Sequence, residues 1–440
     1  MASLDVASDL KFAIANLNDV LENNILKQIA KKENITVDYL KKEIELGTIV
    51  IPLNKKRKNK IKPIAIGKGL FTKVNCNIGT SPDRADLALE LKKLATSIHA
   101  GTDTVMDLST GGDVSEIRKS IINASSVPVG TVPIYEASFI ARKKNMSFVE
   151  LTPKDFLSVV EKQLADGVDF VTVHCGINKH NMQKVKDVKR LTGVVSRGGS
   201  MTIEWMRYNS KENPFYEYYD ELLEIAKEYG ATLSLGDGLR PGSLHDASDE
   251  PQILELLVIS ELVERARSSG VQTIVEGPGH IPLNQIEANV RLEKILCNNA
   301  PFYVLGPLVT DIGCGYDHIT SAIGGALASY YGADFLCYVT PSEHLGLPTI
   351  EDVREGVVAS KLAAHAGDLA RRKKGALVWD NKISKARAML DWKKMIALAI
   401  DPKRAKSIYR ANRQKTEGTC TMCGEFCALK KSKEWLYGKT

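Results

Sequence analysis

The sequence predicts a (β/α)8 barrel, and the prediction rests on the alternation, number and spacing of its apolar runs. From residue 73 to residue 345, short runs rich in β-branched side chains alternate with longer amphipathic stretches. Regular alternation of this kind is typical of parallel strands joined by helices. About eight or nine repeats occur, and their number and total length favour a closed barrel over an open doubly wound sheet.

The short apolar runs are the expected strands. They are KVNCNI (73–78), DTVMDL (103–108), VPVGTV (127–132), DFVTVHC (169–175), GVVS (193–196), TLSLGD (232–237), QTIVEG (272–277), FYVLGP (302–307) and DFLCYV (334–339). Between them, Thr152-Pro153 predicts a helix that begins with a cap and a proline, and Glu250-Pro251 predicts a second helix. We expect these helices to form the outer ring of the barrel.

Helical patterns flank the expected barrel on both sides. Leu, Ile and Val recur at three- and four-residue steps through residues 20–29 and 37–44, before a basic run and Pro63. After residue 345 the strand pattern stops. The predicted divisions are an N-terminal helical segment (1–62), the barrel (63–345), C-terminal helices (346–410) and a cysteine-bearing tail (411–440).

Composition narrows the class of protein. The chain has 440 residues, 44% of them hydrophobic and 25% charged, which is enough to bury one large core. Its net charge of +6 lies partly in KKRKNKIK (55–62) and RRKK (371–374). Such runs usually form solvated faces, and no aromatic residues that stack on bases interleave them, so we expect no nucleic-acid partner.

Location follows from what the sequence lacks. The N-terminus has no signal pattern, and no stretch of about 18 apolar residues is present, so we expect no membrane partner and a cytoplasmic protein. Eight cysteines are too sparse for a disulfide scaffold in so long a chain. A reducing compartment is therefore expected.

Cys420, Cys423 and Cys427 form the most specific motif of the chain, reading C-T-M-C-G-E-F-C. A structural zinc knuckle needs four ligands, and residues 411–440 offer no fourth Cys and no His. Three soft thiolates with one open metal position favour an iron–sulfur cluster. A zinc site completed by a distant residue, and unrelated surface thiols, remain the alternatives.

Polar or metal-capable side chains follow nearly every expected strand, where the active site of a barrel lies. They are Asn77, Asp107 with Ser109-Thr110-Gly111-Gly112, Tyr135, His174, Ser196-Arg197-Gly198-Gly199, Asp237-Gly238-Leu239-Arg240, Glu276 with His280, Asp311 to His318, and Glu343 with His344. The two Gly-rich turns offer backbone N–H groups to a phosphate, and Arg197 or Arg240 adds a charged fork. Together they favour a small, phosphorylated, anionic substrate.

Two histidines and two carboxylic acids stand out among these residues. His280 and His344 follow different strands, so they can face each other across the barrel mouth as ligands of a divalent metal that polarises a carboxylate. Glu276 and Asp237 are the expected acid and base beside them.

Long motifs then make the chain recognisable. MDLSTGGD, VSRGGS, SLGDGLRPGS, EGPGHIPL, CYVTPSEHLGLP and CTMCGEFC resemble the phosphomethylpyrimidine synthase family of thiamine biosynthesis, in its short form, over roughly residues 46–430. The resemblance implies an enzyme in which a four-iron four-sulfur cluster on the three cysteines reduces S-adenosylmethionine (SAM) to a radical. That radical converts 5-amino-1-(5-phospho-D-ribosyl)imidazole, the ribotide, to 4-amino-2-methyl-5-phosphomethylpyrimidine.

The resemblance also implies the site residues and the partners. His280 and His344 match the family's zinc ligands, and Glu276, Asp237 and His174 are the expected catalytic groups. A homodimer and an electron donor for the cluster are implied as well. The positions that resemble the family's substrate contacts are Asn77, Met106, Tyr135, His174, Ser196, Arg197, Gly198, Asp237, Gly238, Leu239, Arg240, Glu276 and Tyr303.

Some residues depart from the family pattern. Residues 313–318 read G-C-G-Y-D-H where A-P-G-Y-D-H is usual, Phe71 stands where an Arg is usual, and Cys76 interrupts an N-x-N segment. We expect these changes to flank the site. They leave open a 5-hydroxybenzimidazole synthase, a paralogue that uses the same ribotide and SAM in anaerobic cobamide biosynthesis. A zinc-loaded binding protein without iron and a zinc hydrolase are the alternatives from other classes.

Overall fold

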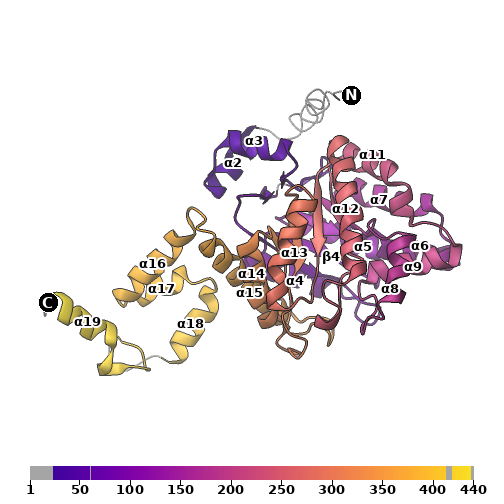
Figure 1. Cartoon of the computed structure of the whole chain (residues 1–440). Coiled ribbons are helices and arrows are strands. Elements are labelled where there is room, and N and C mark those ends of the chain that lie inside the picture. The colour runs from indigo at the N-terminus through magenta and orange to yellow at the C-terminus, as the bar shows by residue number, and fades with distance from the viewer. Residues whose placement is uncertain (1–22, 60, 413–418, 438–440) are drawn as a thin grey trace. The chain divides into compact units, whose positions relative to one another are not determined.

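Eight parallel strands close into a barrel in the computed structural model, which describes residues 23–59, 61–412 and 419–437 (Figure 1). The order around the barrel is β10-β3-β4-β5-β6-β7-β8-β9, so each strand pairs with the next and β10 returns to β3. The barrel strands are β3 (Lys73–Ile78), β4 (Thr104–Asp107), β5 (Val129–Thr131), β6 (Phe170–Val173), β7 (Thr232–Leu235), β8 (Thr273–Gly277), β9 (Phe302–Leu305) and β10 (Phe335–Cys337). The predicted (β/α)8 barrel is confirmed.

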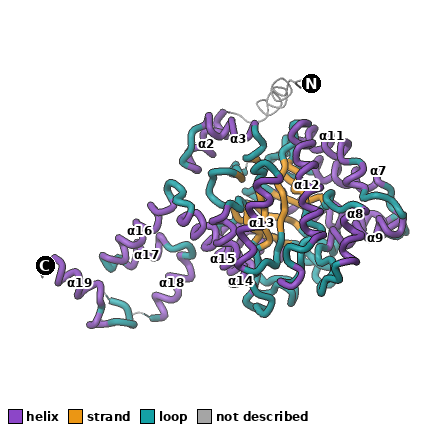
Figure 2. The backbone as a smooth tube through the Cα atoms, viewed as in Figure 1, coloured by secondary structure: helices purple, strands orange, loops and turns teal. Residues whose placement is uncertain are grey.

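Helices surround the strands, as Figure 2 shows. Those of the barrel unit are α4 (Leu87–Ala100), α5 (Val114–Ala124), α6 (Pro133–Lys143), α7 (Pro153–Ala165), α8 (Lys179–Asp187), α9 (Arg197–Asn209), α10 (Pro214–Glu217), α11 (Tyr219–Tyr229), α12 (Glu250–Ser268), α13 (Leu283–Leu296), α14 (Asp317–Tyr331) and α15 (Ile350–Ala370). Both predicted helix starts are present. Thr152 caps α7 ahead of Pro153, and Asp249 caps α12, which has Pro251 in its first turn.

One of the expected strands is not a strand. The run GVVS at 193–196 was predicted as a ninth strand, but it is an irregular connection that leads into α9. Strand β6 pairs directly with β7, so no gap in the barrel is left for it. Ser196 is instead the N-cap of α9, and its hydroxyl accepts a 3.1 Å hydrogen bond from the Gly199 N–H.

The barrel unit extends beyond the predicted boundary at residue 345. Helix α15 lies against α14 and α4, and its buried face includes Val353, Val357 and Ala364. One compact unit runs to Arg371 and a second begins at Arg372. The reason is that α15 is the helix that follows the last strand, so it belongs to the outer ring rather than to a separate C-terminal segment.

The described part of the N-terminal segment has a small core of its own. It contains α2 (Asn23–Glu33), α3 (Val37–Glu45) and β1 (Ile49–Val50). Strand β1 pairs antiparallel with β2 (Ile66–Gly67), which lies beyond the predicted boundary at residue 62. Residues 1–22, including the start of the apolar pattern at 20–29, lie outside the described residues. Buried Glu33 of α2 pairs with buried Lys73 of β3 at 3.0 Å, which ties this segment to the barrel.

In the basic run at 55–62, Lys55, Lys56, Lys58 and Lys62 are exposed, as expected of a solvated face, but Arg57 is not. The Arg57 side chain is only 2% exposed, and its guanidinium lies 3.1 Å from the Asp169 carboxylate. It also donates to the carbonyls of Ser125 and Val127, while the Asn54 amide donates to the carbonyl of Val168. Because Asp169 immediately precedes β6, the run is a strap across the amino ends of the strands.

The second unit is helical. It comprises α16 (Ala376–Ala388), α17 (Trp392–Leu398), α18 (Pro402–Ala411) and, after residues that are not described, α19 (Ala428–Tyr437). The Trp379 indole donates to the Leu398 carbonyl at 2.7 Å, and Trp392 stacks on Tyr409 with ring centroids 5.2 Å apart. These contacts fasten α16 to α17 and α17 to α18.

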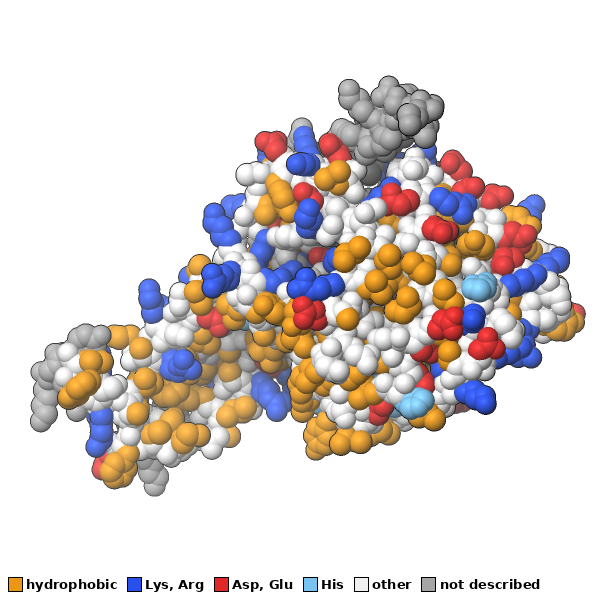
Figure 3. Space-filling view, viewed as in Figure 1, with side chains coloured by type: hydrophobic (Ala, Val, Ile, Leu, Met, Phe, Trp, Pro, Cys, Tyr) orange, Lys and Arg blue, Asp and Glu red, His pale blue; other side chains and the backbone are white. Residues whose placement is uncertain are grey.

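Surface composition and helix length add two observations. On the face of the barrel unit drawn in Figure 3, basic and acidic side chains lie interspersed, so neither sign dominates that face. No helix among the described residues is both long enough and apolar enough to cross a membrane.

The strap predicts a stability effect. Replacing Arg57 with Ala leaves the buried Asp169 carboxylate without its cation, which is expected to lower the free energy of unfolding by about 3–5 kcal/mol. Urea denaturation measures this. Lys58, an exposed residue of the same run, is the matched control, and Lys58→Ala is expected to change it by less than about 0.5 kcal/mol. Equal stability of the two variants would contradict a structural strap.

Candidate active site

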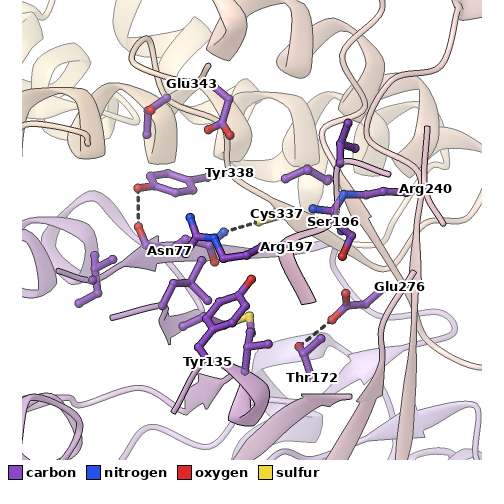
Figure 4. Close-up of a pocket in the computed structure, with 18 of the residues that line it drawn as sticks. Asn77, Tyr135, Thr172, Ser196, Arg197, Arg240, Glu276, Cys337, Tyr338 and Glu343 are labelled. Atoms are coloured by element: carbon purple, nitrogen blue, oxygen red, sulfur yellow. Dashed lines mark hydrogen bonds between the residues drawn. The ribbon is translucent and has the colours of Figure 1, made fainter. Parts of the chain in front are cut away.

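A cavity of about 430 Å³ opens at the carboxyl ends of the strands, and Figure 4 shows part of its lining. It brings together most of the residues predicted to contact substrate. Those that line it are Asn77, Met106, Tyr135, His174, Ser196, Arg197, Asp237, Arg240, Glu276 and Tyr303. Gly198, Gly238 and Leu239 are not among the lining residues, although each is next in sequence to a residue that is.

The glycines allow two backbone segments to approach closely. A Cβ added at Gly198 would lie 2.2 Å from a ring carbon of His174, and one at Gly199 would lie 2.3 Å from the Gly238 carbonyl oxygen. Either substitution therefore forces a backbone or a buried ring to move. The start of α9 is pressed against both His174 and the loop after β7.

Glu276, in β8, is held by hydroxyls from the two preceding strands. Its carboxylate accepts hydrogen bonds from Thr172 at 2.8 Å and Ser234 at 2.6 Å. Burial raises the pKa of Glu276, and these two hydroxyls oppose the rise. Neither hydroxyl was identified from the sequence. Polar residues that alternate with apolar ones inside a barrel strand indicate side chains that point into the barrel, and this pattern could have identified both.

Asp237 and Arg240 form a charged pair in the loop after β7. An Arg240 nitrogen lies 3.2 Å from Asp237 Oδ1, whereas Asp237 Oδ2 has no hydrogen-bond partner in the described chain. Burial raises the pKa of Asp237 to about 8; Arg240 opposes this rise and the nearby Glu276 adds to it. A carboxyl with that pKa exchanges a proton near neutral pH, as a general acid or base requires.

His174 is a neutral imidazole. Burial and, to a smaller extent, the nearby positive charge of Arg240 together lower its pKa to about 3. The Ser196 hydroxyl accepts from the Gly199 N–H at 3.1 Å and lies 3.0 Å from His174 Nε2, where either group can be the donor. His174 Nδ1 is buried and has no hydrogen-bond partner among the described residues.

Two residues missed in the sequence complete the wall shared by β3 and β10. The Asn77 amide donates to the Cys337 sulfur at 3.2 Å, and the Tyr338 hydroxyl donates to the Asn77 carbonyl at 2.6 Å (Figure 4). Burial raises the pKa of Cys337 to about 12, so it is a neutral thiol. On the facing wall, the Arg197 guanidinium lies 5.1 Å from the centroid of the Tyr135 ring.

His280 and His344 form a pair whose orientation suits a metal. Their ring centroids are 5.3 Å apart. His280 Nδ1 lies 2.9 Å from an Asp311 oxygen, and His344 Nδ1 lies 3.3 Å from an Asp317 oxygen. A carboxylate on Nδ1 fixes the tautomer that leaves Nε2 for a metal. Across the described residues no group of three or more His, Cys, Asp or Glu side chains is assembled as a metal site.

The three cysteines occupy one tight turn of the second unit. The Gly424 N–H donates to the Cys420 carbonyl at 3.0 Å, and the Phe426 N–H donates to the Cys423 carbonyl at 2.9 Å. Hydrogen bonds from the backbone N–H groups of Met422 and then Cys423 lower the pKa of the Cys420 thiol. A turn that favours thiolate suits a metal cluster.

The departures from the family pattern lie in different places. Phe71 precedes the amino end of β3, where its N–H donates to Glu33 at 2.8 Å, so it is at the end of the barrel opposite the cavity. Cys76 is buried in β3 and does not line the cavity. Cys314 is exposed in the loop between β9 and α14, which also carries Asp311.

Comparison with known proteins gives a family match and close relatives. The model described as "Radical SAM ThiC family" matches residues 15–434. A phosphomethylpyrimidine synthase from Moorella thermoacetica is 54% identical, covering 93% of this chain and 95% of its own. Another from Caldanaerobacter subterraneus subsp. tengcongensis is 55% identical with the same coverage. A dihydropteroate synthase from Coxiella burnetii in complex with pteroic acid aligns with a TM-score of 0.40 at 12% identity, covering 68% of this chain and 94% of its own, too distant to bear on the reaction.

The environment of His174 predicts a pH effect on stability. Its pKa is about 3 in the fold and near 6.5 in an unfolded chain, so below pH 6.5 the unfolded state binds the extra proton and acid favours unfolding. Between pH 7 and pH 5 the free energy of unfolding is expected to fall by about 2 kcal/mol more in the unaltered chain than in His174→Asn. Urea denaturation at the two pH values measures the difference. Parallel pH profiles would show that His174 is not held neutral.

Proposed function

The chain belongs to the radical SAM ThiC family, and we propose from this premise that it catalyses the phosphomethylpyrimidine synthase reaction of thiamine biosynthesis. It converts 5-amino-1-(5-phospho-D-ribosyl)imidazole to 4-amino-2-methyl-5-phosphomethylpyrimidine. The structural observation that carries this function is the cavity. Two arginines, three carboxyl groups and two imidazoles, one of them the neutral ring of His174, meet there at the carboxyl ends of the strands.

The paralogous reaction is not favoured. A 5-hydroxybenzimidazole synthase would use the same ribotide, so residues that bind the ribotide do not separate the two reactions. The relatives that are 53–55% identical over 92–93% of this chain carry the name phosphomethylpyrimidine synthase. Membership of a radical SAM family likewise disfavours a binding protein or a hydrolase.

Anion binding is assigned to one side of the cavity. The amino end of α9 carries partial positive charge, and Ser196, its cap, lines the cavity together with Arg197. Arg240 adds a second guanidinium. These groups would hold the phosphate of the ribotide, and their placement around one opening would fix its orientation.

Proton transfer is assigned to Asp237, Glu276 and His174. Asp237, with a pKa of about 8, would hold a proton at neutral pH and release it to a product or neighbour. Glu276 is fixed by two hydroxyls and would act from one position. His174, whose pKa is about 3, would stay uncharged at neutral pH beside these two carboxyl groups. Asp237 and His174 are buried and Glu276 is partly buried, so exchange with bulk water would be limited at these groups.

Three bound groups are implied, namely an iron–sulfur cluster, SAM and zinc. Cys420, Cys423 and Cys427 would hold a four-iron four-sulfur cluster, and His280 and His344 would hold zinc. When bound, the cluster and SAM supply radical chemistry, and zinc supplies a Lewis acid for a carboxylate. The family resemblance adds two further proposals, which are assembly as a homodimer and an external electron donor.

Anaerobic turnover tests the proposed reaction. Protein reconstituted with iron and sulfide is incubated with SAM, reductant and the ribotide, and the products are identified by mass. The expected product has the mass of the phosphomethylpyrimidine. Appearance of 5-hydroxybenzimidazole, or zinc-loaded protein that never acquires an iron chromophore, would contradict the proposal.

A pair of cysteine variants supplies the control for that assay. Cys423→Ala is expected to lose the brown chromophore and the product, because two thiolates cannot hold the cluster. Cys314→Ala removes an exposed thiol outside the motif and is expected to retain the iron content of the unaltered protein. Equal loss of iron in both variants would show that the motif is not the cluster site.

A further inference from the structure

The loop that carries Asp237 and Arg240 is held from behind by a buried arginine. Arg190 donates from one terminal nitrogen to the Leu239 carbonyl at 2.6 Å, and from the other to the Arg240 carbonyl at 3.4 Å. The Arg190 side chain is 1% exposed and does not line the cavity. Its contact with the site therefore passes through the backbone of the loop.

Arg190 is itself fixed on several sides. Asp249, the cap of α12, accepts from Arg190 at 2.6 Å and 2.7 Å in a two-point pair, and the Gly193 carbonyl accepts at 3.3 Å. The neighbouring backbone is pinned as well, because the Leu191 and Thr192 N–H groups donate to the Asp246 carboxylate. A guanidinium held this way has one orientation, as its planar fork allows.

Helix α12 holds the same loop a second time. Glu255, one and a half turns into α12, accepts from the Leu239 N–H at 2.7 Å. Leu239 is thus gripped at its N–H by Glu255 and at its carbonyl by Arg190. Both anchors lead to one rigid element, because Asp249 and Glu255 belong to the start of α12.

We propose that Arg190 is a positioning residue for substrate binding. By bonding to the Leu239 and Arg240 carbonyls, it fixes the backbone that carries the Arg240 guanidinium and the Asp237 carboxyl. This inference rests on the proposed function, because it takes the ribotide as the ligand of the cavity. The Arg240 guanidinium would bind the anionic substrate from a backbone position that Arg190 holds in place. Losing the anchor costs binding without removing any group that touches the ligand.

The test measures ribotide binding, which needs neither cluster nor turnover. Calorimetry on the purified full chain gives Kd for the unaltered protein, Arg190→Ala and Arg190→Lys. Removing hydrogen bonds from a charged donor predicts a rise in Kd of about 10- to 100-fold for Arg190→Ala. Arg190→Lys keeps the charge but not the fork, so an intermediate rise is expected. It also remains informative if Arg190→Ala does not fold.

Chemical rescue separates positioning from a general loss of structure. Guanidinium chloride at about 20 mM, far below denaturing concentrations, is expected to restore at least part of the affinity of Arg190→Ala, whereas sodium chloride of equal ionic strength is not. Arg291→Ala is the matched control, since Arg291 is exposed on α13 and pairs with Glu287, one turn earlier in the same helix, at 2.7 Å. Its Kd is expected to equal that of the unaltered chain.

The outcomes are distinguishable. Binding of the ribotide by Arg190→Ala within threefold of the unaltered chain overturns this inference alone, and so does a loss that guanidinium leaves unchanged. Failure of the unaltered chain to bind the ribotide overturns the proposed function and this inference with it.

Discussion

The pairing of β10 with β3 is the constraint on which the site depends. Cys337 and Asn75 face each other across this seam although they lie 262 positions apart. Closure places the end of β10 beside the end of β3, where Tyr338 and Cys337 both bond to Asn77. His344, which follows β10, lines the same cavity only because the sheet is closed. An open sheet would leave these residues at opposite edges.

Burial at the strand-end cavity then shifts the pKa values of its titratable groups. It raises the pKa of Asp237 to about 8, raises that of Glu276 and lowers that of His174 to about 3, so burial disfavours the charged form of each group. An anionic substrate would meet the positive charge of Arg240 beside them. The same burial would protect radical chemistry from water.

Short-range patterns predicted the barrel, because strand–helix alternation and the turn residues after each strand are local. They predicted most of the lining for the same reason. What they missed depends on contacts distant in sequence. GVVS is apolar enough for a strand, but β6 and β7 already pair without it. Arg57 belongs to a basic run, yet its side chain is buried in an ion pair with Asp169, 112 positions away. Arg190 likewise contacts a distant segment, the Leu239 carbonyl in the loop after β7.

We propose that the strand-end cavity holds the ribotide beside a metal on His280 and His344. A crystal structure of the chain with the ribotide and zinc, recorded above and below the zinc absorption edge, tests this. We expect an anomalous peak bonded to Nε2 of both histidines, and ribotide density between Tyr135, Arg240 and Glu276. Ribotide bound elsewhere, or zinc bound away from the two histidines, would contradict it.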